Sequence, residues 1–186
     1  MCTRVCARSV DTMTPRPVAG TEVADGERLH RIDELDLEPV VYKLMHPEPG
    51  VAVLTLASAD QSVALYRCFL KVSVMHPEAS LVPSMAIDHA WHTHMLDTAK
   101  YRADCDLVFG YFMDHFPYAG LRGEDDRAAW REDFARTRQL FREHFGVEIG
   151  AEPAASVCRN HGDGSECCVG DVKRSPDDGR PRPVRA

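Results

Sequence analysis

The stretch that decides the fold is SADQSVALYRCFLKVSV, residues 58–74. Its large apolar side chains recur every three or four residues, which places them on one face of a helix. Ser58 and Gln61 form a capping-box pattern that predicts where this helix begins. This is the clearest helix signal in the chain. The predicted apolar face consists of Val63, Tyr66, Phe69, Leu70 and Val74.

Two further helices are predicted on either side of this segment. Asp36 precedes an apolar segment that ends near Met45, and Pro39 fits the first turn of a helix, where a missing N–H costs nothing. Ser84 is placed to cap a helix that runs to about Leu96.

The C-terminal half of the chain predicts two more helices. Asp97 and Thr98 can cap a helix whose apolar stripe weakens or ends near Gly110. Aromatic side chains then repeat at helical spacing over about residues 125–145, and Gly146 follows as a helix-ending residue. The stripe of the first of these helices is Tyr101, Cys105, Val108, Phe109 and Phe112, and that of the second is Trp130, Phe134, Phe141 and Phe145.

The predicted fold class is therefore mostly α, a single-domain irregular bundle of about five helices with short connections. Residues 51–56 alone look like a strand, and a short one. The helical, His-rich domain is expected to span residues 26–148. Residues 1–25 and 149–186 are rich in Gly, Pro and charged side chains without periodicity, and are expected to be flexible, disordered tails.

Composition excludes several classes of protein. The net charge of −7 falls in the predicted helical domain, because each predicted tail is neutral. The sequence has no cluster of Lys and Arg of the kind that binds phosphates, so a nucleic-acid-binding protein is not expected. The longest apolar run, about residues 51–59, is well short of the ~20 residues that cross a bilayer. The N-terminus lacks the apolar core of a secretory signal, and the seven Cys are irregularly spaced, so a cytoplasmic protein without a disulfide framework is expected.

Histidines are concentrated in SMAIDHAWHTHML, residues 84–96, which is also a predicted helix. Asp88 and His92 are four residues apart and His89 and His92 are three apart, so these side chains share one face. His94 is two residues beyond His92 and points about 200° away. Either the helix ends or distorts near residue 94, or the two histidines have different roles.

Another ligand must come from elsewhere in the chain, and His115 is the natural candidate. It lies in a predicted turn, residues 114–120, that can fold back against the helix. Two imidazoles and the Asp88 carboxylate suit Zn²⁺ with one open position, or Fe²⁺ in a facial triad with three. The predicted divalent metal site is thus Asp88, His92 and His115, with His94 as a further ligand or general base. Residues expected to orient these ligands or to position a substrate are Trp91, Tyr101, Cys105, Asp114, Tyr118 and Asp97.

Two other functions remain open at this point. The cluster can instead be the hydrogen-bonded His/Trp polar core of a non-catalytic interaction module, or a metal-free acid/base pair of His92 with Asp88. No Gly-x-Ser-x-Gly, His-Glu-x-x-His or phosphate-binding glycine loop is present. A small molecule or a peptide is the expected substrate class if the protein is a metal-dependent enzyme. Cys68 and Cys105, in helical patterns, are expected to be small buried hydrophobic residues.

An ordered set of short motifs between about residues 33 and 148 resembles the glycine-rich domain-containing protein-like family of bacteria and plants. The resemblance implies a compact helical domain, but it brings no established reaction. Relatives have His-His where this chain has Asp114-His115, and the Gly- and Cys-rich tail of the family is reduced to residues 158–168. The motifs that carry the resemblance are Asp36 to Met45, Tyr66 to Leu70, His76-Pro77, Leu81 to Ser84, Ile87-Asp88, Trp91 to Thr98, Tyr101, Asp104-Cys105, Phe109-Gly110 and His115 to Gly120.

Overall fold

A computed structural model describes residues 24–150, 173–174 and 181–184 of the chain. Helices dominate this part, and the all-α fold class is confirmed. The helices are α1 (Asp25–Glu34), α2 (Glu38–Met45), α3 (Leu56–Met75), α4 (Met85–Leu96), α5 (Thr98–Val108) and α6 (Glu124–Phe145). Two short strands, β1 (Lys173–Arg174) and β2 (Pro181–Arg182), pair antiparallel beside α2.

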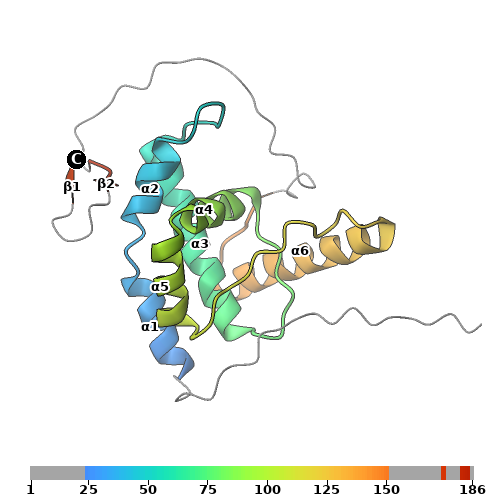
Figure 1. Ribbon diagram of the computed structural model, residues 1–186. Coiled ribbons are helices and arrows are strands. Elements are labelled where there is room, and N and C mark those ends of the chain that lie inside the picture. The colour runs from blue at the N-terminus through green and yellow to red at the C-terminus, as the bar shows by residue number, and fades with distance from the viewer. Residues whose placement is uncertain (1–23, 151–172, 175–180, 185–186) are drawn as a thin grey trace, which may run out of the picture.

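Helix α3 is the centre of the fold and contacts α1, α2, α4 and α6 (Figure 1). The apolar face predicted from its sequence is buried, with none of its five side chains more than 7% exposed. Each such side chain contributes roughly 1.5–3 kcal/mol by leaving water. Helix α4 crosses the middle of the molecule, α5 lies beside α1, and α6 extends away from the body (Figure 1).

Several predicted helix ends are confirmed. Pro39 lies in the first turn of α2. The Asp97 side chain caps α5 by accepting a hydrogen bond from the backbone N–H of Lys100 at 3.3 Å. Gly146 ends α6 in the left-handed conformation at φ 65°, which favours glycine. Ser84 precedes α4 as expected, but its buried hydroxyl makes no capping hydrogen bond to a described residue.

Three local predictions were wrong. Helix α3 begins one turn before the predicted capping box, because Thr55 Oγ1 accepts the hydrogen bond from the Ser58 backbone N–H. Residues 51–56 form no strand, since the apolar run has no partner strand among the described residues and Val51 and Val53 are exposed. Helix α1 was missed, which makes six helices where about five were expected.

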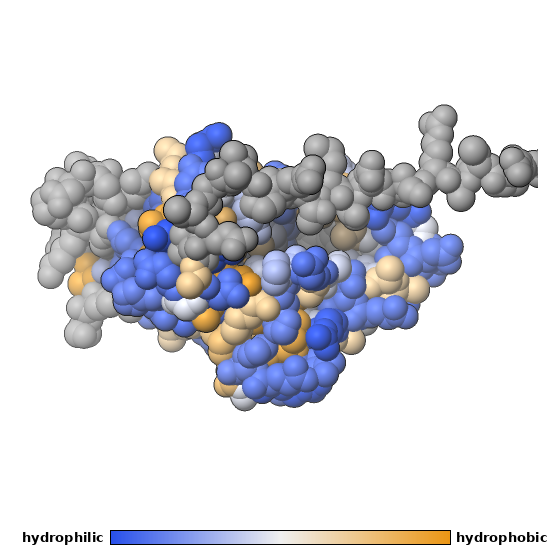
Figure 2. All heavy atoms as spheres, turned by 90° about the horizontal axis from the view of Figure 1, so that it is seen from below, coloured by the Kyte–Doolittle hydropathy of each residue, from blue (hydrophilic) through white to orange (hydrophobic). Residues whose placement is uncertain are grey.

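The polar faces of the helices cover the core. Figure 2 shows a largely hydrophilic surface with small apolar patches between the polar side chains. Among the described residues, no helix combines the length and the apolar character needed to span a bilayer. The predicted tails lie mostly outside the described residues, as does the Cys-containing segment 158–168. Ile149, placed in the C-terminal tail by sequence, is 1% exposed and packs in the core.

Candidate metal centre

Helix α4 supplies two of the candidate ligands from one face. Asp88 and His92 are four residues apart, so their side chains project from the same side of successive turns. Asp88 Oδ2 lies 3.6 Å from His92 Nδ1. The carboxylate thus lies against the imidazole and leaves its other oxygen, Oδ1, free to face a third residue.

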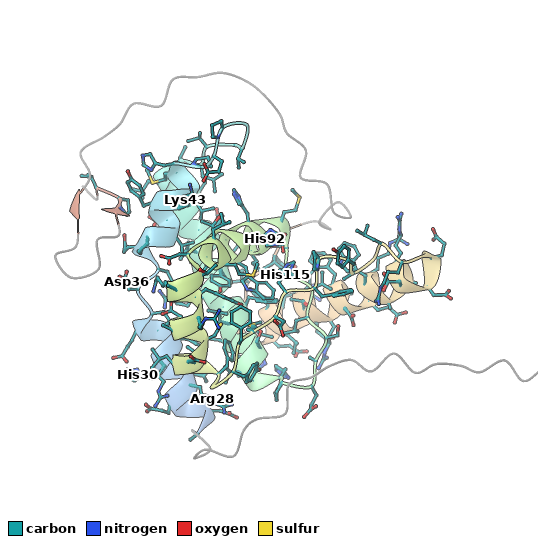
Figure 3. The ribbon with its side chains drawn as sticks, viewed as in Figure 1. Arg28, His30, Asp36, Lys43, His92 and His115 are labelled. Atoms are coloured by element: carbon teal, nitrogen blue, oxygen red, sulfur yellow. The ribbon has the colours of Figure 1, made fainter. Side chains whose placement is uncertain are left out.

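The connection between α5 and α6 brings His115 to this face of α4. Figure 3 shows His92 on α4 and His115 beside it on the connection. His115 Nε2 lies 3.2 Å from His92 Nε2 and 3.0 Å from Asp88 Oδ1. An imidazole Nε2 has either one hydrogen to donate or one lone pair to accept with. These two contacts therefore cannot both be good hydrogen bonds.

The spacing of the three donors matches that of metal ligands. Metal–nitrogen bonds of about 2.0–2.1 Å place two tetrahedral ligand atoms about 3.3 Å apart. Asp88, His92 and His115 offer ligand atoms that all lie within 4.8 Å of one another, the one such group of three among the described residues. Their side chains are 34%, 42% and 15% exposed, respectively, so solvent reaches the centre and positions remain for water or substrate.

A buried hydrogen-bonded chain fixes the position of His115. Trp91 Nε1–H donates to the Tyr101 hydroxyl at 2.9 Å, and that hydroxyl donates to the backbone carbonyl of Met113 at 2.5 Å. The Trp91 ring also meets the His115 ring edge to face, with centroids 4.7 Å apart. Two of the residues predicted to orient the ligands, Trp91 and Tyr101, therefore hold the connection that carries His115.

His94 does not join the metal centre, so its prediction as a further ligand was wrong. Helix α4 continues regularly to Leu96, and His94 therefore points into the core, where it is 1% exposed. Tyr66 Oη lies 3.1 Å from its Nδ1, and Asp104 Oδ2 lies 3.1 Å from its Nε2 without the alignment of a good hydrogen bond. His92 and His94 therefore lie in different surroundings, His92 beside His115 and His94 in the core.

The buried network around His94 involves residues that sequence reasoning missed. Burial raises the pKa of Tyr66 well above its ordinary value, which keeps the phenol neutral and able to donate. Burial also favours a raised pKa for Asp104, but contacts with His94 and Lys100 outweigh it and the pKa is lowered. Tyr66 and Asp104 lie on α3 and α5, and no local pattern relates them to His94.

Other predicted site residues lie around the centre rather than in it. Cys105 is buried, and burial raises the pKa of its thiol, so it is a packing residue as expected. The Asp114 carboxylate is exposed and makes no hydrogen bond or ion pair to any residue that the structure describes. Asp97 caps α5, and Tyr118 is exposed on the connection, where its ring contacts Phe116.

Burial lowers the pKa of His92, and the neighbouring His115 lowers it further against the opposing effect of Asp88. Burial and the proximity of His92 also lower the pKa of His89. Both rings are therefore neutral at pH 7, and a neutral imidazole is the form that binds metal.

In chelator, the free energy of unfolding is expected to fall as the pH drops from 7.5 to 5.5. The unfolded rings take up protons near pH 6.5 while the folded rings of His89 and His92 resist protonation, so the unfolded state binds more protons. Urea denaturation at a series of pH values measures this slope. His92→Gln should flatten it, and a slope that His92→Gln leaves unchanged would contradict the assignment.

Residues 27–139 match the model of a protein family described as UCP032817-like, which covers more than half of the chain and the whole candidate metal centre. The chain belongs to this family. The UCP032817-like region includes α2 to α5 and most of α1 and α6.

A plant relative of this UCP032817-like chain is glycine-rich domain-containing protein 1 of Arabidopsis thaliana. The two are 30% identical over 92 residues, which is 47% of this chain and 11% of the plant protein. The predicted resemblance to the glycine-rich domain-containing protein-like family is thereby confirmed. This chain spans only about a tenth of the plant protein's length. No solved structure matches the chain.

Proposed function

We propose that the protein binds one divalent metal ion, Fe²⁺ or Zn²⁺, through Asp88, His92 and His115. The observation that carries this proposal is the convergence of two donors, His92 Nε2 and Asp88 Oδ1, on His115 Nε2, which has at most one N–H and cannot satisfy both neighbours. A metal ion removes the conflict, because each imidazole then presents a lone pair and the carboxylate presents an oxygen to the same centre.

The open geometry of the centre extends the proposal to a small non-haem metalloenzyme. Three protein ligands leave one position on tetrahedral Zn²⁺, or three on six-coordinate Fe²⁺, for water, substrate or oxygen. The exposure of His92 and Asp88 makes these positions accessible to a small molecule or to a peptide. A bound ion would supply Lewis acidity or a lowered pKa of bound water.

An interaction module is the second candidate function, and the buried polar network favours it. Tyr66, His94 and Asp104 meet inside the core, and Trp91 bonds to Tyr101 beside them. Such a network stabilises a helical domain without any ion. In that case the Asp88, His92 and His115 cluster is an extension of the same polar network to the surface.

Metal analysis of the full-length protein separates the two functions. Protein purified anaerobically and passed through gel filtration is expected to retain about one Fe or Zn per chain, measured by mass spectrometry of the element. A chelator should remove the ion and lower Tm. Because the predicted tails carry five thiols, a variant with Cys2, Cys6, Cys158, Cys167 and Cys168 replaced by Ser is the control and should keep the ion. Protein that is purified without metal, and whose Tm does not change with chelator or with added Fe²⁺ or Zn²⁺, would favour the interaction module.

A further inference from the structure

A second pair of histidines meets where α3 and α6 end. His76, the residue that ends α3, faces His144 in the last turn of α6. Their Nε2 atoms lie 2.7 Å apart, and the ring centroids are 5.0 Å apart at an interplanar angle of 56°. The two residues lie 68 positions apart in the sequence, and no local pattern relates them.

The backbone that carries this pair is held in place by two further polar contacts. Ser80 Oγ donates to Asp133 Oδ2 at 2.7 Å, and the backbone N–H of Val82 donates to the Thr137 hydroxyl at 3.0 Å. Asp133, Thr137 and His144 recur at four and seven residues, so they lie on one face of α6. The two imidazoles are thus brought together by fixed elements.

We propose that His76 and His144 form a second metal site, which binds a borderline divalent cation such as Cu²⁺, Zn²⁺ or Ni²⁺. Imidazole nitrogen suits these ions, whereas Mg²⁺ and Ca²⁺ prefer oxygen. Ligands at about 2.0–2.1 Å from an ion lie about 3 Å apart or slightly more, so the rings need to separate by only a few tenths of an ångström. His144 is exposed and free to make this movement.

The surroundings leave room for the other ligands of such an ion. A surface cavity of about 420 Å³ adjoins His76 and is also lined by Glu78, Asp133 and Arg136. The two carboxylates outnumber the one guanidinium, so the net charge of these side chains favours a cation, and the volume of the cavity admits water molecules. Among the described residues, no third His, Cys, Asp or Glu lies close enough to join His76 and His144 in a group of three ligands. Water would therefore occupy the other coordination positions of the ion. Two protein ligands make this site weaker than the three of the candidate metal centre.

An ion at this site would join the C-terminal ends of α3 and α6. In the metal-free pair one ring must donate its N–H to the other. A cation replaces this single hydrogen bond by two coordinate bonds. On binding, the proton of the donating ring moves from Nε2 to Nδ1, so no net charge is lost from the protein.

Zinc titration of the full-length, chelator-treated protein tests this site independently of the first. The probe is Zn²⁺, which is diamagnetic, and the readout is the ¹⁵N–¹H correlation spectrum of the histidine rings. The background is His92→Ala, which removes a ligand of the candidate metal centre. The Nε2 signals of His76 and His144 are expected to shift with saturating zinc. His144→Gln should weaken zinc binding there about tenfold or more, so the His76 signal should shift much less at the zinc concentration that half-saturates the parent protein.

His30→Gln is the matched control, because His30 is an exposed histidine that pairs with Glu34 on α1. This variant should leave the shifts of His76 and His144 unchanged. If the candidate metal centre binds no ion but the second site does, the parent protein will be purified without a tightly bound ion, and the His76 and His144 signals will still shift with zinc. Signals of His76 and His144 that do not move at millimolar zinc, or a His76 signal that moves equally in His144→Gln, would overturn the second site.

Discussion

His115→Ala is expected to lower the affinity of the protein for Fe²⁺ or Zn²⁺ by at least about 100-fold. The substitution removes a donor that lies 3.2 Å from His92 Nε2 and 3.0 Å from Asp88 Oδ1. Loss of a residue that only orients a ligand already costs 10–100-fold, so loss of the ligand itself costs more. Competition with a chromophoric chelator in the full-length protein measures the affinity.

His89→Ala is the matched control for this experiment. His89 belongs to the same helix and is partly buried, but it is not part of the group of three donors. Its replacement should change metal affinity by no more than about twofold. Equal losses of metal affinity in the two variants would mean that binding depends on the general stability of α4. An unchanged metal affinity in His115→Ala would contradict the proposed ligand set.

Trp91→Ala is expected to reduce the free energy of unfolding by about 3–5 kcal/mol. The buried indole packs against Phe69, with ring centroids 5.4 Å apart, and against His115. Its N–H also donates to the Tyr101 hydroxyl, so the variant opens a cavity and removes a hydrogen bond together. Urea denaturation in the presence of chelator measures the loss without any contribution from bound metal.

Trp91→Phe separates packing from hydrogen bonding at the same position. Phenylalanine keeps an aromatic ring against Phe69 and His115 but has no N–H for Tyr101. Its expected cost is smaller, about 1–2 kcal/mol for the lost hydrogen bond and the smaller ring. A cost of less than about 1 kcal/mol for Trp91→Ala, or equal costs for the two variants, would show that the indole does not support this part of the core.

Local patterns predicted those parts of the fold that depend on one helix at a time. The stripe on α3, the proline at the start of α2 and the cap of α5 each depend on neighbours within a few residues. Helix α1 was missed because it has a single buried residue, Ile32, and therefore almost no apolar stripe. Residues 51–56 have the composition of a strand, but a strand also needs a hydrogen-bonding partner, which composition does not reveal.

The part of the candidate site that depends on local sequence spacing was predicted. The four-residue spacing of Asp88 and His92 fixes their common face, and the Pro and Gly after His115 indicate a connection able to turn back. The partners of His94 depend instead on how α3 and α5 pack against α4. Tyr66 and Asp104 lie 28 and ten residues from His94, on other helices, so periodicity gives no account of their contacts.

The opposite directions of His92 and His94 give α4 a fixed rotational phase. A rotation of α4 about its axis that repositions His92 would also move His94 away from Tyr66 and Asp104. Polar atoms in the core would then lack hydrogen-bond partners, which costs free energy. The direction in which α4 presents Asp88 and His92 is therefore held by the interior behind it. The connection that carries His115 is held in turn by the hydrogen bonds of Trp91 and Tyr101, so the same core determines both sides of the candidate metal centre.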